Sequence, residues 1–544
     1  MNVSNYAYVR ACNLAAWQGT WPRVRLDRLP DSVCSIVRCV ALMKRIFSHP
    51  VTALAAGLCL RLFFVHKYPM VSSDTVLYEQ IAGNWLEHHV YAMTVDGRIV
   101  PADLRMPGYP AFLAMIYALT GRTGPDARGY VMAAQVAVDL CSCLVIAALA
   151  ALLALLRPQA ASWKRVFMGT LWLAVLCPFT ANYAAVPLTE VFAGFFTAAA
   201  LVSLIVLMWD VSGGGAPLFR TGWLARHAEP IFAFTSGFLI GMGTLFRPES
   251  PLLLVVAWIV IGFIGLRRKR FLFCLQLVVL SAVGCALPLV PWAVRNAVTL
   301  DEVQFLAPKN SNLPGELVPY GFMAWEKTWL FRVKDCYLVP WKLNGEVINL
   351  EDIPARAFDT AEEKERVAAI LEQYNKDVTL SSEEDAAFGQ LARERTARHP
   401  LRTYVWLPVA RALTIWFTPR IELLPFSGQV FPLRKAWQED PIDQSVTVGF
   451  FLLNAFYVAL AVCGACRISR ESPSLRPAIA LLFGYLLLRT AFLTTLETPE
   501  PRYVLVCFPA LLALAGQVST RSVRPPELAK RATLPDYFSS TGSG

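Results

Sequence analysis

The chain has 544 residues, of which 56% are hydrophobic and only 17% are charged, and its mean hydropathy is +0.45. This composition excludes an ordinary soluble enzyme and predicts a polytopic membrane protein. The excess of 50 Lys and Arg over 40 Asp and Glu is modest. It serves to orient helices in a membrane, and we expect no nucleic-acid partner because no stripe of basic and aromatic residues is present.

Residues 1–42 contain no apolar run long enough to span a membrane, and Met43 begins a short basic lead into the first apolar segment. We expect these residues to be a cytoplasmic tail or to lie upstream of a start at Met43. A chain that begins at Met43 should then insert and function. An amphipathic segment at the membrane interface is the alternative.

The apolar segments predict an all-α polytopic protein with a bundle of about 10–11 transmembrane helices, since each helix needs about 20 apolar residues to cross the hydrocarbon. Segment 110–120 has about 11 residues and would form about 17 Å of helix, which is too short to cross. We expect it to lie on the outer membrane surface. The predicted spans are 48–66, 129–156, 163–181, 188–209, 231–247, 250–266, 271–294, 446–466, 476–496 and 502–518.

Lys and Arg residues are distributed unevenly between the short segments that connect these helices. With the N-terminus inside, the inner segments together, among them 157–165, 267–270 and 467–476, hold most of them, as the positive-inside rule requires. This orientation places loop 67–128 outside, and it also places residues 296–445 outside as one long, mainly helical insertion. The predicted organisation is a tail (1–42), a transmembrane module (43–295), the insertion (296–445), C-terminal transmembrane helices (446–520) and a cytoplasmic tail (521–544).

Two parts of the insertion have distinct patterns. Segment 360–399 alternates acids and bases with apolar residues at helical spacing, which predicts two amphipathic helices. Segment 403–418 is apolar enough to span, but Pro408 and Arg411 interrupt it. We expect an interfacial or re-entrant helix there. Cys336 is the only cysteine of the insertion, so no disulfide can form within it.

The stretch from Val71 to Pro110 is unusually polar for this chain, and a polar loop at the rim of a membrane bundle is where we expect chemistry. Asp74 lies at the predicted start of a helix that runs to about Glu87. Ser73 or Asp74 could cap this helix, and a simple N-cap is the structural alternative to a catalytic role. The helix is amphipathic, so the carboxylate would meet both lipid headgroups and a soluble acceptor.

Several other polar and aromatic residues have structural interpretations. We expect Asp139 and Gln135 to make helix–helix hydrogen bonds, and Arg61 to snorkel or pack. The adjacent residues His88 and His89 are expected to be structural. The aromatic residues of the insertion could form its core or could stack on a sugar, and we favour the core; they are Trp325, Trp329, Tyr337 and Trp341.

Six short motifs occur in a characteristic order. They are Asp74–Tyr78, Arg105-Met106-Pro107-Gly108-Tyr109-Pro110, Pro187-Leu188-Thr189-Glu190, Arg247-Pro248-Glu249, Pro291-Trp292-Ala293-Val294-Arg295-Asn296 and Pro501-Arg502-Tyr503. In this order they resemble the GT-C glycosyltransferases of the protein O-mannosyltransferase-like superfamily (family 39 type), which are related to the aminoarabinose transferases of lipid A. The resemblance covers about residues 45–520.

The resemblance implies a membrane glycosyltransferase with an extracytoplasmic active site in a bacterial inner membrane. The donor would be a sugar on a polyprenyl phosphate, and the acceptor could be a protein, a lipid, a glycan or a lipopolysaccharide. Asp74 would be the general base that deprotonates the acceptor hydroxyl, with inversion at the anomeric carbon. An unperturbed Asp is ionised at neutral pH, and a positioned base contributes about 10²–10⁴ in rate.

The resemblance also implies residues that bind the substrates. Because the leaving group is a phosphate, arginines should neutralise it, and guanidinium groups can grip phosphate with two hydrogen bonds. For Arg247 and Arg502 an interfacial anchor is the alternative, and for Glu190 a placement at the helix dipole is the alternative. The expected substrate-binding residues are Arg105, Tyr109, Glu190, Arg247, Glu249, Arg502 and Tyr78.

Mannosyltransferase-type members often carry an acid directly after the catalytic aspartate, where this chain has Thr75. We therefore expect no metal site and no cofactor apart from the lipid-linked donor, although a divalent metal is possible. A transporter or flippase of lipid-linked glycans is the alternative function. It is disfavoured because we find no internal repeat, and because the polar residues gather on one side of the predicted membrane.

Overall fold

The structure is a computed structural model that describes residues 48–157, 163–213, 222–308, 310, 316–428, 430–431 and 433–519, without the side chains of 222–226 and 435. The predicted tails at 1–42 and 521–544 lie outside the described residues. The described residues fall in two units, which divide between Ala53 and Leu54. The polar loop around Asp74, the insertion and the C-terminal helices all belong to the second unit.

The structure confirms an all-α polytopic membrane protein. Seven described helices are long and apolar enough to cross a membrane, and the bent pair α7–α8 makes an eighth span if it is counted as one. The other two of the ten predicted segments are also helical, as α10 and the 16-residue α11. The bundle contains α3 (Pro50–Lys67), α6 (Arg128–Leu155), α7 (Trp163–Val175), α8 (Pro178–Ala181), α9 (Glu190–Ser212), α10 (Gly222–Thr244), α11 (Leu252–Arg267), α12 (Phe271–Ala286), α13 (Val290–Thr299), α20 (Pro441–Glu471), α21 (Arg476–Leu493), η10 (Pro501–Cys507) and α22 (Phe508–Ala515).

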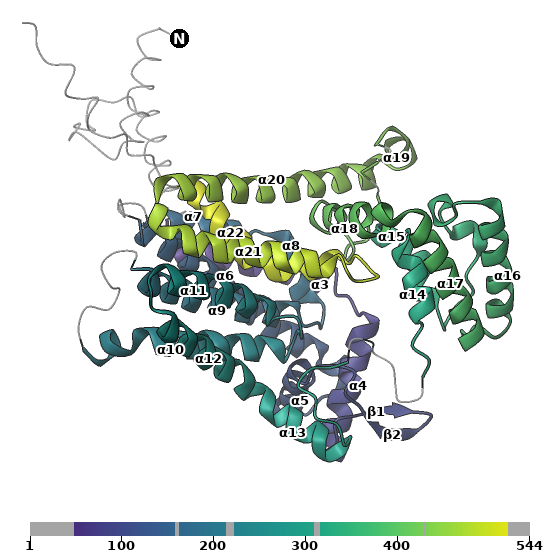
Figure 1. Ribbon diagram of the computed structural model, residues 1–544, viewed down its shortest axis with the longest axis horizontal. Coiled ribbons are helices and arrows are strands. Elements are labelled where there is room, and N and C mark those ends of the chain that lie inside the picture. Colours follow the sequence, from purple (N-terminus) through teal and green to yellow (C-terminus); the bar gives the residue numbers. More distant parts are fainter. Residues whose placement is uncertain are drawn as a thin grey trace, which may run out of the picture. The chain divides into compact units, whose positions relative to one another are not determined.

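The order of these helices determines which loops meet. Helix α9 packs on α10, and α10 lies beside α12 (Figure 1). Consecutive helices run in opposite directions, so the start of α9, the α10–α11 loop and the α21–η10 loop collect at one end of the bundle. The basic loop at 267–270 between α11 and α12 lies at the opposite end. The polar motifs therefore share one end of the bundle, away from that basic loop.

The loop after α3 contains α4 (Ser73–His88), a small hairpin and α5 (Gly108–Thr120). The cap of α4 is Ser72 rather than the predicted Ser73 or Asp74. The Ser72 hydroxyl accepts from the backbone N–H of Thr75, and the Thr75 hydroxyl accepts from the N–H of Ser72, both at 3.2 Å. This capping box satisfies the helix start. The Asp74 carboxylate is therefore available for other contacts.

The hairpin was not expected from the sequence. Strands β1 (Ala92–Val95) and β2 (Arg98–Pro101) pair in antiparallel register around a two-residue turn. Asp96 and Gly97 form this turn with φ values of 49° and 73°, and Asp-Gly is a strong signal for such a turn. Helix α5 has 13 residues, or about 20 Å of helix, which agrees with a segment too short to cross.

The insertion is mainly helical, and the two helices predicted in segment 360–399 are present as α16 and α17. Trp325 and Trp329 are 1% exposed in its core, as expected. Tyr337 and Trp341 are not core residues, because they are 52% and 44% exposed and contact each other edge-to-face at 4.3 Å. The elements are α14 (Tyr320–Lys327), α15 (Val333–Leu338), η5 (Pro340–Lys342), η6 (Leu350–Asp352), η7 (Ala355–Ala357), α16 (Ala361–Asp377), α17 (Ser382–Arg398), a π-helix (Arg402–Trp406), α18 (Leu407–Trp416) and, near the start of α20, α19 (Leu433–Glu439).

Helix α18 occupies the ambiguous segment 403–418. The π-helix Arg402–Trp406 runs directly into it, and this combined stretch is not among the described helices that are long and apolar enough to cross a membrane. Arg411 is buried and donates to the carbonyls of Lys327 at 2.7 Å, Leu330 at 2.9 Å and Thr494 at 3.3 Å. Arg411 thereby fixes α18 to the end of α14 and to the end of α21.

Arg61 does not snorkel, which corrects one of the two expectations for it. Its side chain is fully buried, and its Nε donates to Asp139 Oδ2 at 2.6 Å. Its Nη1 donates to the carbonyls of Gly57 and Val175, both at 2.9 Å. The guanidinium thus joins α3, α6 and α7. The helix–helix contact that we expected for Asp139 is confirmed, with Arg61 as its partner.

Candidate active site

Asp74, in the first turn of α4, accepts hydrogen bonds from two arginines. Its Oδ1 accepts from Arg105 Nη2 at 2.8 Å, and its Oδ2 accepts from Arg502 Nη2 at 2.9 Å. The exposed fractions of the three side chains are 22%, 22% and 19%. The carboxylate is therefore held on both oxygens, yet solvent reaches all three groups.

Two close contacts position the segments that carry Asp74 and Arg105. The Thr75 hydroxyl donates to the Pro187 carbonyl at 3.1 Å, which ties α4 to the motif before α9. The Gly108 N–H donates to the Leu245 carbonyl at 2.8 Å. A Cβ at Gly108 would lie 2.6 Å from that oxygen, so only glycine allows this approach. These contacts place the Arg105 turn against the end of α10, just before Arg247.

The ion pairs continue from Arg502 to the other motifs. Arg502 Nε lies 2.5 Å from a Glu500 oxygen and 3.9 Å from Glu190. Arg247 donates to Glu190 and lies 3.8 Å from Glu249, whose carboxylate accepts from Arg489 at 2.9 Å. This charged cluster consists of Asp74, Glu190, Glu249, Glu500, Arg105, Arg247, Arg489 and Arg502.

The cluster contains six of the eight predicted site residues and two that sequence reasoning missed. Arg489 lies in the apolar helix α21, is fully buried, and donates to the Tyr503 carbonyl at 3.1–3.2 Å as well as to Glu249. A charge inside an apolar segment was a usable signal for Arg489. Glu500, two residues before Arg502, carried no comparable signal.

The arginines control the ionisation of the acids outside the membrane spans. Burial alone would raise the pKa of Asp74, but the charges of Arg502 and Arg105 outweigh burial and lower this pKa to about 2. Burial likewise opposes ionisation of Glu249, but Arg489 and Arg247 lower its pKa below the usual value. Tyr78 faces the cluster, and burial together with the charge of Asp74 raises its pKa to about 12. At neutral pH these two acids are therefore charged, and Tyr78 is a neutral hydroxyl.

Tyr109 lies behind the cluster rather than in it. Its side chain is fully buried, its hydroxyl donates to Gln135 Oε1 at 2.7 Å, and its ring contacts Tyr78 edge-to-face at 5.0 Å. Burial raises the pKa of its hydroxyl well above the usual value. In this structure Tyr109 packs beneath Tyr78, and its predicted substrate-binding role stays a prediction.

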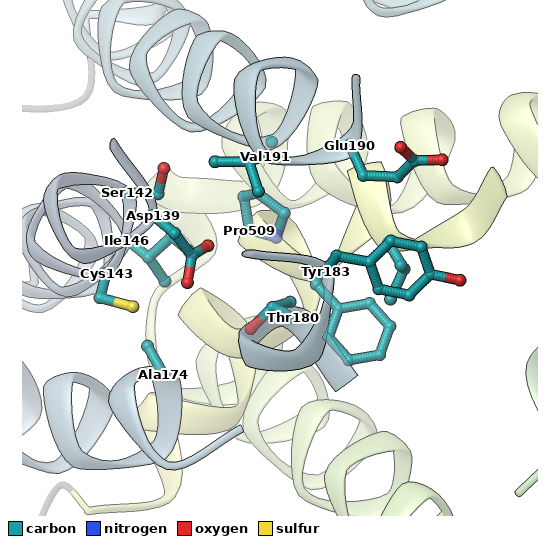
Figure 2. Close-up of a pocket in the computed structure, with 13 residues that line it drawn as sticks. Asp139, Ser142, Cys143, Ile146, Ala174, Thr180, Tyr183, Glu190, Val191 and Pro509 are labelled. Atoms are coloured by element: carbon teal, nitrogen blue, oxygen red, sulfur yellow. The ribbon is translucent and has the colours of Figure 1, made fainter. Parts of the chain in front are cut away.

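A small cavity extends from Glu190 into the bundle and has a volume of about 30 Å³. Figure 2 shows Asp139 and Cys143 on one side of it and Tyr183 and Glu190 on the other. Glu190 Oε2 is buried and has no hydrogen-bond partner among the described residues. A cavity of this size has room for about one or two waters, and its lining is mainly apolar with a few polar groups. This oxygen is therefore suited to bind a water or a substrate hydroxyl.

The residue after Asp74 is engaged elsewhere. The Thr75 side chain is fully buried, and its hydroxyl bonds to both Ser72 and Pro187. A second carboxylate is thus replaced at this position by a residue that fixes α4. The absence of a metal requirement stays a prediction.

No family model and no curated protein matches the chain. Among solved structures, the chain is similar to the oligosaccharyltransferase AglB from Archaeoglobus fulgidus, in complex with an inhibitory peptide and a dolichol-phosphate. The identity is 12% and the TM-score 0.43, over 86% of this chain and 50% of AglB, so the chain spans about half the length of AglB.

The chain is also similar to ArnT from Cupriavidus metallidurans over 82% of this chain and 77% of that one. The apo structure has an identity of 14% and a TM-score of 0.36, and the structure bound to undecaprenyl phosphate has 15% and 0.35. With TM-scores below 0.5, these matches carry no argument about the reaction of this chain, which is inferred from its own residues.

Proposed function

We propose that the chain is a membrane glycosyltransferase that moves a sugar from a polyprenyl-phosphate donor to the hydroxyl of an extracytoplasmic acceptor. The observation that carries this proposal is the carboxylate of Asp74 held between Arg105 and Arg502 at one end of the bundle. A base and cations for an anionic leaving group are the two components that such a transfer requires. The motif resemblance supports the same reaction class.

In the proposed reaction, Asp74 accepts the proton of the acceptor hydroxyl. The acceptor oxygen forms a bond to the anomeric carbon as the bond between that carbon and the phosphate oxygen breaks. The electron pair of the broken bond stays on the phosphate, which changes from a diester with one negative charge to a monoester with up to two. Attack from the face opposite the leaving group inverts the anomeric configuration.

The arginines of the cluster stabilise the charge that develops on the phosphate. Arg105 and Arg502 both contact Asp74, so their guanidinium groups lie on either side of one carboxylate. A cation placed at the leaving oxygen stabilises the transition state more than the ground state, and this difference accelerates the chemical step. Arg247 is one step farther away, held by Glu190.

The place of the cluster in the bundle supports a site on the extracytoplasmic side of a bacterial inner membrane. The cluster lies at helix ends opposite the loop of Arg267, Arg268, Lys269 and Arg270. Basic loops remain in the cytoplasm. A polyprenyl phosphate keeps its phosphate at the membrane surface, where it would meet the cluster.

The alternative is a transporter, which would need a polar substrate site deep within the bundle. The deepest charged pair in the first helices, Arg61 and Asp139, is engaged by protein groups. The guanidinium bonds to Asp139, to two backbone carbonyls and, at 3.2 Å, to Cys143 Sγ. This pair has the geometry of a helix anchor, which favours the enzyme.

The test is transfer by the purified protein. A synthetic short-chain prenyl-phosphate sugar is incubated with the protein and with a cell-envelope extract that supplies the acceptor hydroxyl, and the released prenyl phosphate is measured. Mass spectrometry of cell-envelope glycans, lipids and proteins with and without the gene identifies the acceptor. Release of prenyl phosphate together with loss of one envelope glycan is expected. Movement of intact donor across vesicles without cleavage would contradict the proposal and favour the transporter.

We propose further that the reaction needs no divalent metal. The position next to Asp74 is Thr75, and guanidinium groups supply positive charge at the proposed phosphate site. Transfer should persist after treatment with EDTA. A loss of transfer that added magnesium or manganese restores would contradict this.

A further inference from the structure

Both oxygens of Asp74 are engaged by the two arginines that are proposed to hold the donor phosphate. Arg105 Nη2 lies 2.8 Å from Oδ1, and Arg502 Nη2 lies 2.9 Å from Oδ2. In the protein without donor, the proposed base therefore engages the N–H groups that are proposed to hold the leaving phosphate. The two anions cannot use the same N–H groups at once.

We infer that Asp74 competes with the donor phosphate for Arg105 and Arg502, and that the arriving phosphate displaces the carboxylate and thereby converts it into a free base. This inference rests on the proposed function and concerns the order of events at the same site. The donor would bind first, and only then could Asp74 accept the proton of the acceptor hydroxyl.

The electrostatics of the site support the consequence for base strength. With both arginines in place, the pKa of Asp74 is about 2, so the clamped carboxylate is a weak base. Loss of the two charge-assisted hydrogen bonds, and the approach of a negative phosphate, would both raise the proton affinity of Asp74. Tyr78 also faces this carboxylate, but it is neutral.

Arg105 and Arg502 each have another partner in the protein, which holds the guanidinium group in place when the carboxylate leaves. Arg105 Nη1 donates to the Leu104 carbonyl at 3.0 Å, and Arg502 keeps its ion pair with Glu500 at 2.5 Å. The Arg502–Glu500 unit is in turn fixed through Tyr503, whose hydroxyl donates to Glu500 at 2.7 Å. The displaced group is thus Asp74, since it has the more exposed side chain of the two acids that contact Arg502 at hydrogen-bonding distance.

Helix α4 offers a matched control. Glu79, five residues after Asp74, accepts from Arg128 Nε at 2.7 Å and from Arg128 Nη2 at 2.8 Å. This pair has the same chemistry on the same helix, but it does not contact Arg105 or Arg502. Neutralising Glu79 should therefore leave phosphate binding unchanged.

The experiment measures binding of farnesyl phosphate to the purified full chain by titration calorimetry. Asp74→Asn and Asp74→Ala each remove the competing anion. Both should bind this lipid roughly tenfold or more tightly than the wild type, because the phosphate no longer has to displace a charge-assisted hydrogen bond. Glu79→Gln should bind like the wild type. Asp74→Glu, which retains the anion, should show no such gain.

A second measurement uses the wild type itself, in case the variants unfold. Infrared difference spectra on addition of farnesyl phosphate should show a shift of a carboxylate stretching band. The same shift should appear in Glu79→Gln, because the band belongs to Asp74. Affinity equal to or below that of the wild type in folded Asp74→Asn, or no carboxylate shift in the wild type, would overturn the inference. Failure of sugar transfer with a preserved gain in affinity would instead remove the proposed function, and no binding to any variant would remove both.

Discussion

Asp74 and Arg502 are 428 residues apart in the sequence and are joined by a hydrogen bond of 2.9 Å. The first polar loop and the segment η10 near the end of the described chain thus meet in one site. Arg502 also contacts Glu500 and lies 3.9 Å from Glu190. A substitution in either of the two segments should therefore alter ion pairs throughout the charged cluster.

Arg105 tests the role of the leaving-group cation. Arg105→Lys keeps the charge but loses the planar fork, so it should retain partial activity. Arg105→Ala should lose much more, mainly in kcat at saturating donor, since the charge is needed most in the transition state. The measurement is steady-state release of prenyl phosphate by variants with matched unfolding temperatures. Normal kcat in Arg105→Ala would shift the leaving-group role to Arg247 or Arg502.

Arg489 is predicted to be a positioning residue that fixes the backbone next to Arg502. Arg489→Gln leaves Glu249 without its closest cation and should destabilise the protein by about 3–5 kcal/mol, as expected for a broken buried ion pair. The double variant Arg489→Gln/Glu249→Gln removes both charges and should recover part of this stability. Thermal unfolding measures the loss of stability and its partial recovery. The ratio of kcat to KM for the donor measures how well Arg502 is positioned. Additive losses in the double variant would contradict the pairing.

The low pKa of Asp74 predicts a pH-dependent contribution to stability. Its pKa is about 2 in the folded protein, below the usual 3.8. The ion pairs of Asp74 therefore contribute stability that is fully present above about pH 4 and is lost as the pH falls towards 2. The difference in unfolding temperature between the wild type and Asp74→Asn should shrink over that window. A difference that stays constant from pH 5 to pH 2.5 would show that Asp74 is not held by charge.

The aromatic residues of the insertion give a contrast between core and surface. Trp325→Ala should destabilise the protein by about 3–5 kcal/mol, because it empties a packed core position. Trp341→Ala should change stability by less than about 1 kcal/mol, because that side chain is half exposed. Thermal unfolding of both variants distinguishes them. Equal losses in the free energy of unfolding would mean that Trp341 is also buried.

The orientation of the chain is tested by labelling with a membrane-impermeant thiol reagent in a cysteine-depleted background. Cysteines that replace Thr94, in the hairpin, and Ser382, in α17, should react from outside. A cysteine that replaces Ser474, between α20 and α21, should not react. Reaction at position 474 from outside would show that segment 403–418 crosses the membrane after all, or that the assigned orientation is wrong.

Much of the fold and of the site follows from the sequence, for physical reasons that particular residues illustrate. Long apolar runs predict helices because the backbone must be satisfied internally in lipid, and all ten predicted segments are helical. Successive helices cross the membrane in opposite directions, so the polar motifs lie near helix ends on the same side, and their meeting was predictable. These motifs contribute Asp74, Arg105, Glu190, Arg247, Glu249 and Arg502.

What the sequence did not predict depends on contacts between distant segments. The burial of Arg61 against Asp139, 78 residues away, requires the packing of α3 on α6. The buried placement of Tyr109 depends on Gln135, and the inclusion of Glu500 depends on the turn before η10. The local sequence around any one of these residues carries no information about such contacts. The hairpin at Asp96-Gly97, in contrast, has a local signal in its Asp-Gly turn.

The proposed role of Asp74 as the base is tested by a comparison of three proteins. Single-turnover sugar transfer is measured for the wild type, Asp74→Asn and the matched helix-α4 variant Glu79→Gln, with saturating short-chain prenyl-phosphate sugar and an acceptor identified from the cell envelope. Asp74→Asn should insert normally and lose activity by about 10² or more, the contribution of a positioned base, while Glu79→Gln stays near the wild-type rate. Transfer by folded Asp74→Asn at a rate near that of the wild type would contradict the account.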